Sequence, residues 1–503
     1  MPQDIIKIEN VYYSYPDINR APQTEGAQKK WALENISLSV KEGEFLAVMG
    51  KNGSGKTSFC RLFNGAVPSL YGGRFSGTVT VDGLRTDKTP VPLLALKAGM
   101  VFDDPDAQLF TSSVRREAAF GPENLLLAPE EIKQRVEFAL SSTGLRGFEE
   151  RQPSTLSGGE KQRLVIAAAL AMNGKIIVLD EPLSRLDTQG VDEVMSVLKE
   201  LRLKYQITVI MASHNSAKMA EFADRVCILG EGRVIACDCA DSIFANTALL
   251  DENGIQPPRG ADIHDVFTAD SVSLPDEKEA VGIKNLCFSY GKDNARIDNI
   301  NLSIKDNDFV AIIGRNGCGK TTLLKNITGL LRPCCGDIFI RGKNTKEMTV
   351  SSISKEAGFV MQNPQYQLFT DSVFNEISFA LKNSGLAEDE INKRVQDAID
   401  TAGLKDRDAF PHALSAAERT KTVIASVLAM GCKIVIFDEA DTGQDYPGQT
   451  RIMNIARELH SKGFTVIFVT HSMHLTCEYA HRLILMDKNG IVMDRRRMNR
   501  HEE

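Results

Sequence analysis

The stretch Leu46-Ala-Val-Met-Gly50-Lys-Asn-Gly-Ser-Gly-Lys-Thr57 joins an apolar run to a glycine-rich turn, and a helical pattern follows it. Glycines allow successive backbone N–H groups in such a turn to face one phosphate. The lysine then reaches the β- and γ-phosphates, and the threonine hydroxyl binds Mg²⁺ at the positive end of the helix. A strand before the loop and a helix after it are the context that this function requires. The stretch therefore predicts an α/β fold with a nucleoside triphosphate site.

The same pattern returns in the second half of the chain as Val310-Ala-Ile-Ile-Gly314-Arg-Asn-Gly-Cys-Gly-Lys-Thr321. Further pairs follow in the same order: Gln108-Leu-Phe110 with Gln367-Leu-Phe369, Leu179-Asp-Glu181 with Phe437-Asp-Glu439, and Ser213-His214 with Thr470-His471. The chain of 503 residues therefore consists of two homologous halves. We predict a first domain over 1–250, a linker over 251–278, and a second domain over 279–503.

Composition narrows the class of protein. Hydrophobic residues make up 43% and charged residues 25%, which is typical of a folded soluble protein. The formal net charge of -7 argues against a nucleic-acid partner, which usually meets a basic surface. Apolar runs such as Lys175–Leu179 are far shorter than the roughly 20 residues that span a bilayer. Any membrane role is therefore expected to depend on a partner protein.

Three expectations concern side chains outside the repeated motifs. The ten cysteines include no CxxC pair, which favours reduced thiols over a zinc site or a disulfide framework. Cys318 lies inside the second glycine-rich loop, where a helix N-terminus tends to lower a thiol pKa, so we expect a reactive thiol. The arginines at 495–497 are expected to form a solvated tail.

Each half also contains an apolar run that ends in two acids, Ile176-Ile-Val-Leu-Asp180-Glu181 and Ile434-Val-Ile-Phe-Asp438-Glu439. A buried strand would deliver both carboxylates to its carboxyl end, where open α/β sheets bind ligands. Asp180 and Asp438 are then expected to hold Mg²⁺, and Glu181 and Glu439 to polarise the attacking water. A solvated turn is the alternative for either pair taken alone. The alternation of short β-branched runs with helical patterns predicts a parallel sheet covered by helices.

Between these motifs stands Leu156-Ser-Gly-Gly-Glu-Lys-Gln-Arg163, which resembles the signature of the ATP-binding-cassette (ABC) ATPases. Ser157 followed by Glu160 would also suit an ordinary capped helix start, but that reading does not explain Gly158 and Gly159. The resemblance covers about nine-tenths of the chain. It implies two tandem P-loop ABC ATPase domains, each with a mostly parallel sheet core and a helical signature subdomain, that use ATP and Mg²⁺.

The phosphate loops and the resemblance together give the expected site residues. Those expected to contact ATP are Tyr15, Gly50, Asn52, Gly53, Gly55, Lys56, Thr57, Ser58, Ser157, Gly158, Gly159 and Glu160, and Tyr290, Gly314, Asn316, Gly317, Gly319, Lys320, Thr321, Thr322 and Ser415. Those expected to hold Mg²⁺ are Thr57, Asp180, Thr321, Gln362 and Asp438, and those expected to act in catalysis are Glu181, His214, Gln362, Glu439 and His471. The resemblance alone implies the adenine-stacking role of the tyrosines, the γ-phosphate contact of the histidines, the role of Gln362, and a communication role for Asp187 and Asp445.

The chain departs from the family pattern at several positions. Asp103 stands where the second half has Gln362, and Ala416 and Ala417 stand where the first signature has two glycines. Ala440 replaces the proline found at Pro182 in the first half. The family implies a head-to-tail pairing of the two halves, in which Asp103 and the altered signature serve the same ATP. We therefore expect an asymmetric enzyme in which the site containing Lys320 and Glu439 carries most of the hydrolysis.

Two further stretches, Asp106-Ala-Gln108-Leu-Phe110 and Gln365-Tyr-Gln367-Leu-Phe369, resemble the ATPases of energy-coupling-factor importers. That resemblance implies a transmembrane subunit and a substrate-capture membrane protein as partners, and a peripheral position on the cytoplasmic face of the membrane. A place in the subdomain core is the alternative for the Leu-Phe pairs. Two other classes remain open: the duplicated ATPase of sugar or nucleoside importers, and a soluble two-cassette protein of the ribosome. The second class usually has a long charged arm and two intact signatures.

Overall fold

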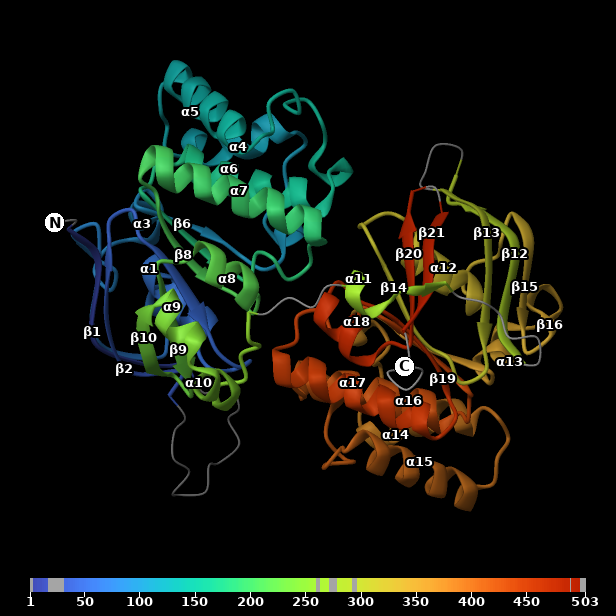
Figure 1. The fold of residues 1–503 in the computed structure, drawn as a ribbon. Coiled ribbons are helices and arrows are strands. Elements are labelled where there is room, and N and C mark those ends of the chain that lie inside the picture. The colour runs from blue at the N-terminus through green and yellow to red at the C-terminus, as the bar shows by residue number, and fades with distance from the viewer. Residues whose placement is uncertain are drawn as a thin grey trace, which may run out of the picture. The chain divides into compact units, whose positions relative to one another are not determined.

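A computed structural model of the chain describes residues 3–16, 31–258, 263–270, 278–291, 296–488 and 490–497. The chain divides into two compact units, the first built from Met1–Arg259 and Asp445–Pro447 and the second from Gly260–Gln444 and Gly448–Glu503. Each unit is considered by itself (Figure 1). No helix in the described ranges combines the length and the apolarity that crossing a membrane requires.

The first unit contains a six-stranded sheet of order β10-β9-β3-β8-β7-β6 and a four-stranded sheet of order β2-β1-β4-β5. The strands are β1 (Asp4–Ser14), β2 (Leu33–Lys41), β3 (Phe45–Met49), β4 (Arg74–Val81), β5 (Leu84–Arg85), β6 (Ala98–Val101), β7 (Ile176–Asp180), β8 (Thr208–Ala212), β9 (Arg225–Gly230) and β10 (Arg233–Cys239). The helices are α1 (Lys56–Phe63), α2 (Ala66–Ser69), α3 (Val91–Ala95), α4 (Val114–Asn124), α5 (Pro129–Ser142), α6 (Gly158–Ala171), α7 (Thr188–Tyr205), α8 (Ser216–Phe222), α9 (Ala240–Ala245) and α10 (Thr247–Glu252).

The larger sheet explains why the apolar runs in the sequence are short and continuous. Every residue of β3, β7 and β8 is buried, because helices cover both faces of a parallel sheet. All of its strand pairs are parallel except the pair between β9 and the edge strand β10. The carboxyl ends of β3 and β7 therefore lie at one edge of the sheet, as the sequence predicts.

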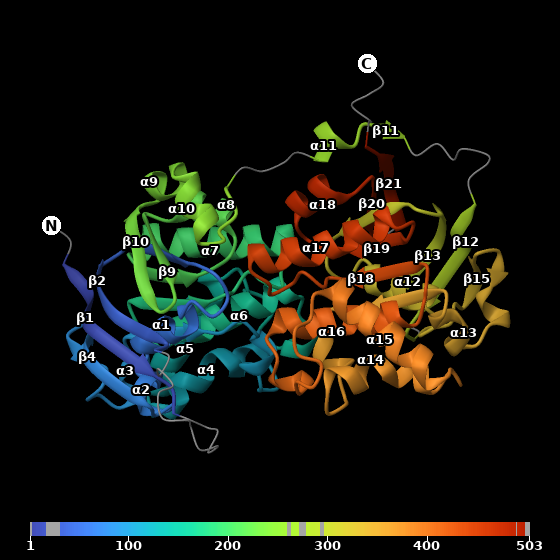
Figure 2. The same cartoon turned by 90° about the horizontal axis from the view of Figure 1, so that it is seen from below.

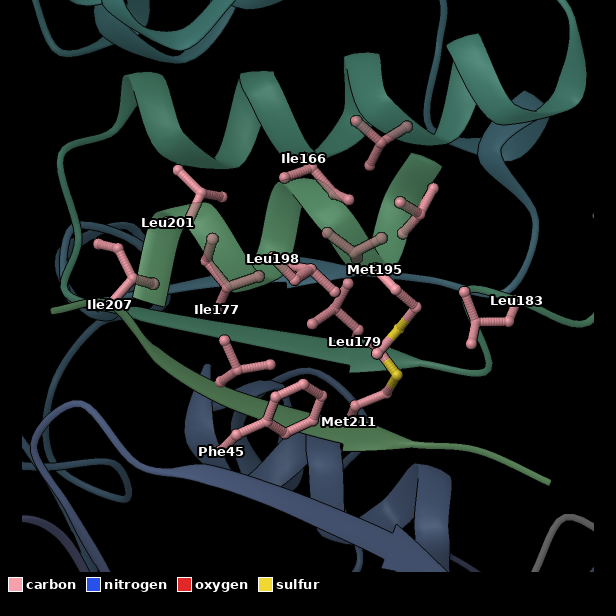
Figure 3. Close-up of a cluster of buried hydrophobic side chains, with 14 of the residues drawn as sticks. Phe45, Ile166, Ile177, Leu179, Leu183, Met195, Leu198, Leu201, Ile207 and Met211 are labelled. Carbon is pink, nitrogen blue, oxygen red and sulfur yellow. The ribbon is translucent and has the colours of Figure 1, made fainter. Parts of the chain in front are cut away.

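Helices α6 and α7 pack on this sheet through aliphatic side chains. Figure 3 shows Ile166 of α6 and Leu198 of α7 pointing toward Ile177 and Leu179 of β7, with Phe45 of β3 beneath. Burying one such side chain contributes about 1.5–3 kcal/mol. The helices α4, α5 and α6 lie together on one side of the unit and form the predicted helical subdomain (Figure 1).

The second unit repeats this plan with a seven-stranded sheet of order β11-β21-β20-β14-β19-β18-β17 and a four-stranded sheet of order β13-β12-β15-β16. The strands are β11 (Ala269–Asp270), β12 (Glu279–Ser289), β13 (Arg296–Lys305), β14 (Phe309–Gly314), β15 (Cys335–Ile340), β16 (Lys343–Asn344), β17 (Ala357–Val360), β18 (Ile434–Asp438), β19 (Thr465–Val469), β20 (Arg482–Asp487) and β21 (Gly490–Arg496). The helices are α11 (Ile263–Val266), α12 (Lys320–Ile327), α13 (Val350–Ser354), α14 (Val373–Lys382), α15 (Glu388–Ala402), α16 (Ala416–Ala429), α17 (Tyr446–Ser461) and α18 (Met473–Tyr479). Figure 2 shows α14, α15 and α16 side by side as the second helical subdomain.

The boundaries at 250 and 279 stay predictions. Within the predicted linker, α11 and β11 are described, and β11 pairs with β21 of the second unit.

The expectation that all cysteines are reduced is wrong for one pair. Cys287 on β12 and Cys335 on β15 form a disulfide, with their Cα atoms 5.0 Å apart. The two residues are directly opposite each other in the antiparallel ladder, which places their side chains within bonding reach. The CxxC pattern does not reveal this pair, because 48 residues separate the two cysteines in the sequence.

The expectation of a solvated arginine tail is also wrong. Arg495 and Arg496 belong to β21, which pairs with β20 up to Arg496. Arg496 donates to the buried carboxylate of Asp308 at 2.9 Å, and the neighbouring Asp494 accepts from Arg482 at 2.6 Å. One arginine of this cluster, Arg496, is therefore neutralised by an acid that only the fold brings near.

Truncation after Met493 should destabilise the second unit, because it removes two of the groups that satisfy the buried Arg482 and Asp308. Breaking a buried ion pair by removing one partner costs about 3–5 kcal/mol. We expect a lower Tm for this unit in calorimetry of the full-length protein. Truncation after Arg497, which leaves β21 complete, is the matched control and should leave the transition in place. Equal transitions for the two truncated proteins would contradict a structural role for the end of β21.

Candidate functional site

The first phosphate loop connects β3 to α1. Gly53 and Gly55 adopt φ angles of 77° and 105°, which only glycine adopts without strain. A Cβ at Gly55 would also lie 2.7 Å from the carbonyl oxygen of Ala32. Lys56 begins α1, and its buried ammonium donates to the carbonyl oxygen of Gly50 at 2.9 Å. The side chain therefore crosses the loop and places a positive charge in its concavity.

The second phosphate loop repeats this geometry between β14 and α12. Lys320 donates to the carbonyl oxygens of Gly314 at 2.8 Å and Arg315 at 3.2 Å. Its ammonium lies 3.9 Å from the Glu439 carboxylate, and that of Lys56 lies 3.8 Å from Glu181. The structure thus brings each predicted phosphate-binding lysine beside the predicted catalytic glutamate of its own unit.

Both glutamates have left-handed backbone conformations, with φ angles of 53° at Glu181 and 51° at Glu439. Such a conformation costs a non-glycine residue of order 1–3 kcal/mol and is found preferentially at functional sites. Each is held by a backbone hydrogen bond to the neighbouring strand, from Glu181 to Ala212 at 2.9 Å and from Glu439 to Val469 at 3.1 Å. The turn lets consecutive acids at the end of one strand face the same site. The sequence carries no signal for it.

Four of the five residues predicted to hold Mg²⁺ lie at the start of the helix after each loop and at the end of the acidic strand, and the fifth, Gln362, follows β17. Thr321 donates to Asp438 at 3.0 Å, and burial raises the pKa of Asp438 to about 6. Burial likewise raises the pKa of Asp180, whose Oδ1 is buried without a hydrogen-bond partner among the described residues. No cluster of three or more His, Cys, Asp or Glu side chains able to hold a metal occurs in the described parts of the chain. One carboxylate and one hydroxyl suit Mg²⁺, which takes its other ligands from water and phosphate.

In the second unit Glu439 lies between two of the other predicted catalytic residues. Its Oε2 accepts from Gln362 at 2.8 Å, and its Oε1 lies 3.1 Å from Nε2 of His471. Burial alone would raise the pKa of Glu439, but the hydrogen bond from His471 and the charge of Lys320 outweigh it and lower the pKa. The carboxylate is therefore ionised at neutral pH and able to accept a proton from water.

The first unit holds Glu181 differently. Its Oε1 lies 3.2 Å from Nε2 of His214, which is also 3.1 Å from Oδ1 of Asn52. Burial raises the pKa of Glu181, and the negative charge of Asp103 raises it further. Burial lowers the pKa of His214 to about 3, so this imidazole is neutral at pH 7. The substitution of glutamine by Asp103 therefore works against an ionised glutamate in this unit.

The two predicted adenine-stacking tyrosines occupy equivalent places. Tyr15 contacts the Ser58 hydroxyl at 3.0 Å, and Tyr290 contacts the Thr322 hydroxyl at 3.2 Å. Their rings are partly exposed beside the helices that follow the phosphate loops, so neither is a core residue. Their stacking role stays a prediction.

Both signatures start a helix with the same capping box. Ser157 accepts from the backbone N–H of Glu160 at 3.3 Å, as Ser415 does from that of Glu418. A Cβ at Gly159 would lie 3.2 Å from the Cα of Gly190 in α7. The capping box of the second signature forms without the two glycines, and Ala416 and Ala417 add a methyl group at each of the corresponding positions.

The expectation of a low-pKa thiol at Cys318 is wrong. The side chain is buried, and a Cβ at Gly314 would lie 2.9 Å from its sulfur. Burial raises the pKa of Cys318 more than the nearby Lys320 lowers it. The thiol packs beneath the loop, in the place that Ser54 takes in the first unit.

One pair of polar residues in the second unit was missed by the sequence analysis. The buried Asp441 accepts from the Thr470 hydroxyl at 2.6 Å, and Thr470 itself accepts from the backbone N–H of Ser472 at 3.0 Å. Burial raises the pKa of Asp441 to about 6. The pair ties the segment after Glu439 to the strand end that carries His471. Leu183 takes the place of Asp441 in the first unit, so a comparison of the two halves could have revealed it.

Comparison with known proteins assigns the family. A family model described as ABC transporter matches residues 33–184 and 297–442. A candidate ABC transporter ATP-binding protein of Methanosarcina acetivorans is 36% identical, over 97% of this chain and 85% of that protein. A second, of Caldanaerobacter subterraneus subsp. tengcongensis, is 34% identical over 92% of this chain and 88% of that protein. Among solved structures, cbiO1 of Clostridium perfringens, part of the ABC transporter complex cbiONQ, is 33% identical over 51% of this chain and 97% of its own, with a TM-score of 0.43.

Replacement of Thr470 by valine should cost about 1–3 kcal/mol of stability, because it leaves the buried Asp441 carboxylate without its hydroxyl partner. In an Asp441→Leu background the same replacement should cost much less. The difference is measured as a double-mutant cycle from urea denaturation of the full-length protein. Ser213→Ala is the matched control, since Ser213 follows β8 in a unit with Leu183 in place of an acid. A coupling energy near zero would contradict the proposed pairing.

Proposed function

The chain belongs to the ABC transporter family and is an ATPase with two ATP-binding cassettes; from this we propose that it drives import through separate membrane subunits, and that its second unit supplies most of the hydrolysis. The observation that carries the second part is the environment of the two glutamates. Glu439 has a lowered pKa and accepts hydrogen bonds from Gln362 and His471, whereas Glu181 has a raised pKa beside Asp103.

The proposed chemistry follows from these side chains. Lys320 holds positive charge within the phosphate loop, where it offsets the charge of the β- and γ-phosphates. Glu439 accepts a hydrogen bond, and then a proton, from the attacking water, and His471 keeps its carboxylate oriented. Mg²⁺, held by Thr321, Asp438 and Gln362, would neutralise charge on the phosphate oxygens. In the first unit Thr57, Asp180, Glu181 and His214 provide the corresponding groups.

We further propose that the two units pair head to tail, as in the family. The signature at Ser157–Glu160 would then complete the ATP site of Lys320, and the altered signature at Ser415 would complete the site of Lys56. Asp103 and Ala416–Ala417 would consequently weaken the same site. Both departures are therefore compatible with one active and one slow site.

Exposed aromatic side chains support a protein partner. Phe110 and Phe369, 65% and 61% exposed, each make an edge-to-face contact with a second partly exposed phenylalanine, Phe120 or Phe379. Exposed aromatic pairs at equivalent places in both units are typical of interaction surfaces. Leu368, by contrast, is buried, so the core reading of the Leu-Phe stretches holds for this leucine and not for the phenylalanines.

Hydrogen bonds connect this surface to the nucleotide site. The side chain of Gln367 accepts from the backbone of Met361 at 2.8 Å and donates to that of Phe359 at 2.9 Å, at the end of the strand that leads to Gln362. The buried Glu376 accepts from the backbone N–H groups of Phe369 at 3.0 Å and Thr370 at 2.9 Å. Gln108 and Glu117 make the same bonds in the first unit. A partner that moves Phe110 or Phe369 would therefore also move the strand end that precedes Asp103 or Gln362.

Replacement of Glu439 by glutamine should lower the ATPase rate by about 10²–10⁴-fold, because it removes the general base of the faster site. Replacement of Glu181 by glutamine should spare a substantial part of the activity. Both rates are measured on the full-length protein with saturating MgATP. Equal losses from the two matched substitutions would refute the proposed asymmetry.

Combined replacement of Phe110 and Phe369 by alanine should abolish co-purification of membrane subunits and leave basal ATPase activity within about twofold, since neither ring lies in the phosphate loops. Leu203→Ala, which removes an exposed apolar side chain from α7, is the control and should retain the partners. Isolation of the parent protein with ribosomes and without membrane proteins would contradict the transport function. Retention of membrane subunits by the double variant would contradict only the docking role of the phenylalanines.

A further inference from the structure

We propose that Cys237 and Cys227 form a reversible redox site in the first unit, in which Cys237 reacts with small-molecule disulfides and Cys227 then closes an internal disulfide. The pair lies on β10 and β9, where Cys227 is paired in register with Val48 of β3, two residues before Gly50 of the phosphate loop. Cys237 is half-buried on the edge strand, and Cys227 is fully buried beneath it.

The backbone places the two thiols within bonding reach. Cys237 and Cys227 are directly opposite each other in the antiparallel ladder of β9 and β10. Opposed residues in such a ladder have Cα atoms about 4.5–5.5 Å apart, within the range of about 4.4–6.8 Å that a disulfide requires. The second unit has a bonded example of this arrangement, since Cys287 and Cys335 are also directly opposed. Closing the bond therefore needs no rearrangement of the sheet.

The guanidinium of Arg225 contacts the sulfur of Cys237, and the corresponding guanidinium of the second unit has an acidic partner at that place. Arg225 begins β9 and donates to Glu44 at 3.0 Å and to the sulfur of Cys237 at 3.1 Å. In the second unit the corresponding Arg482 begins β20 and donates to Asp308 and, with two hydrogen bonds of 2.7 and 2.6 Å, to Asp494.

Register identifies Asp494 as the counterpart of Cys237. Asp494 is opposite Ile484, two residues after Arg482, as Cys237 is opposite Cys227, two residues after Arg225. A thiol in the first unit thus occupies the place of a carboxylate in the second. A guanidinium that has a carboxylate partner in one copy of the fold has a sulfur partner in the other, and a thiolate satisfies it as the carboxylate does.

The pKa shifts of the two thiols agree with Cys237 as the attacking residue and Cys227 as the residue that closes the disulfide. The hydrogen bond from Cys227, assisted by the charge of Arg225, lowers the pKa of Cys237. The same hydrogen bond and, as the second cause, burial raise the pKa of Cys227. Cys237 is therefore the thiol that ionises and attacks more readily, and Cys227 becomes reactive once Cys237 is part of a mixed disulfide.

The reaction balances as a thiol–disulfide exchange. The Cys237 thiolate attacks one sulfur of a small disulfide, forms a mixed disulfide and releases one thiolate. Cys227 loses its proton, its sulfur attacks the Cys237 sulfur, and a second thiolate leaves and takes up that proton. Two protein thiols are oxidised to one disulfide, and one small-molecule disulfide is reduced to two thiols.

The experiment treats the full-length protein, in a Cys239→Ser background, with oxidised glutathione and maps the peptides without reduction. We expect a peptide that links Cys227 to Cys237 and that a reducing agent converts back to two thiols. In Cys227→Ser, Cys237 should carry glutathione as a stable mixed disulfide. In Cys237→Ser, the buried Cys227 should remain a free thiol, as buried Cys60 should in every sample.

Two further measurements distinguish a built site from incidental oxidation. Arg225→Gln should slow the alkylation of Cys237 by iodoacetamide at pH 7 several-fold, because it removes the positive charge beside the sulfur. Cys237→Asp, which reproduces the arrangement in the second unit, should keep the Tm of the parent, whereas Cys237→Leu should lower it. The proposal is overturned if Cys237 stays unmodified by oxidised glutathione, if Cys227 reacts in the Cys237→Ser protein, or if Arg225→Gln leaves the alkylation rate unchanged.

Discussion

The edge at which the buried parallel strands end is the constraint on which both units depend. Strands β3 and β14 run into the phosphate loops, and β7 and β18 end in the paired acids at the same edge of their sheets. Because these strands are apolar at nearly every position, a charged group can appear only where the strand leaves the sheet. The left-handed conformation at Glu181 and Glu439 then brings both acids of each pair to the site. The ends of the strands that stabilise each sheet therefore also position the residues of the site.

The two units show how little backbone change is needed to make two sites unequal. The phosphate loops, the capping boxes and the left-handed glutamates have the same backbone conformation in both units, whereas the side chains around the glutamate differ between them. His471 and Lys320 lower the pKa of Glu439 despite its burial, whereas Asp103 adds negative charge near an already buried Glu181. A duplicated chain can keep the family residues around one glutamate while those around the other change, because each unit keeps its own core.

The two units also differ at the antiparallel edge of the larger sheet. An arginine at the start of β9 or β20 anchors the antiparallel edge of each sheet, with Asp494 as its partner in one unit and Cys237 in the other. Strand β9 also runs beside β3, and the carbonyl oxygen of Leu229 packs against Gly50 of the phosphate loop. The thiol pair consequently lies two residues from backbone that supports the nucleotide site. At the opposite edge, Gln108 and Gln367 join exposed phenylalanines to the strand that precedes Asp103 or Gln362.

The duplication, the α/β class, the phosphate loops, the acidic strand ends and the capped signatures could all be predicted from the sequence, because each depends on residues that are close along the chain. Tertiary structure decided what depends on neighbours distant in sequence. Examples are the disulfide between Cys287 and Cys335, the ion pair of Arg496 with Asp308, and the hydrogen bond between Thr470 and Asp441. No local spacing in the sequence predicts any of these pairs. Burial decided the acidity of Cys318, since desolvation outweighs a nearby lysine only once the side chain is packed under the loop. Local pattern fixes which groups are present, and the packed fold fixes their partners, their solvation and hence their charge.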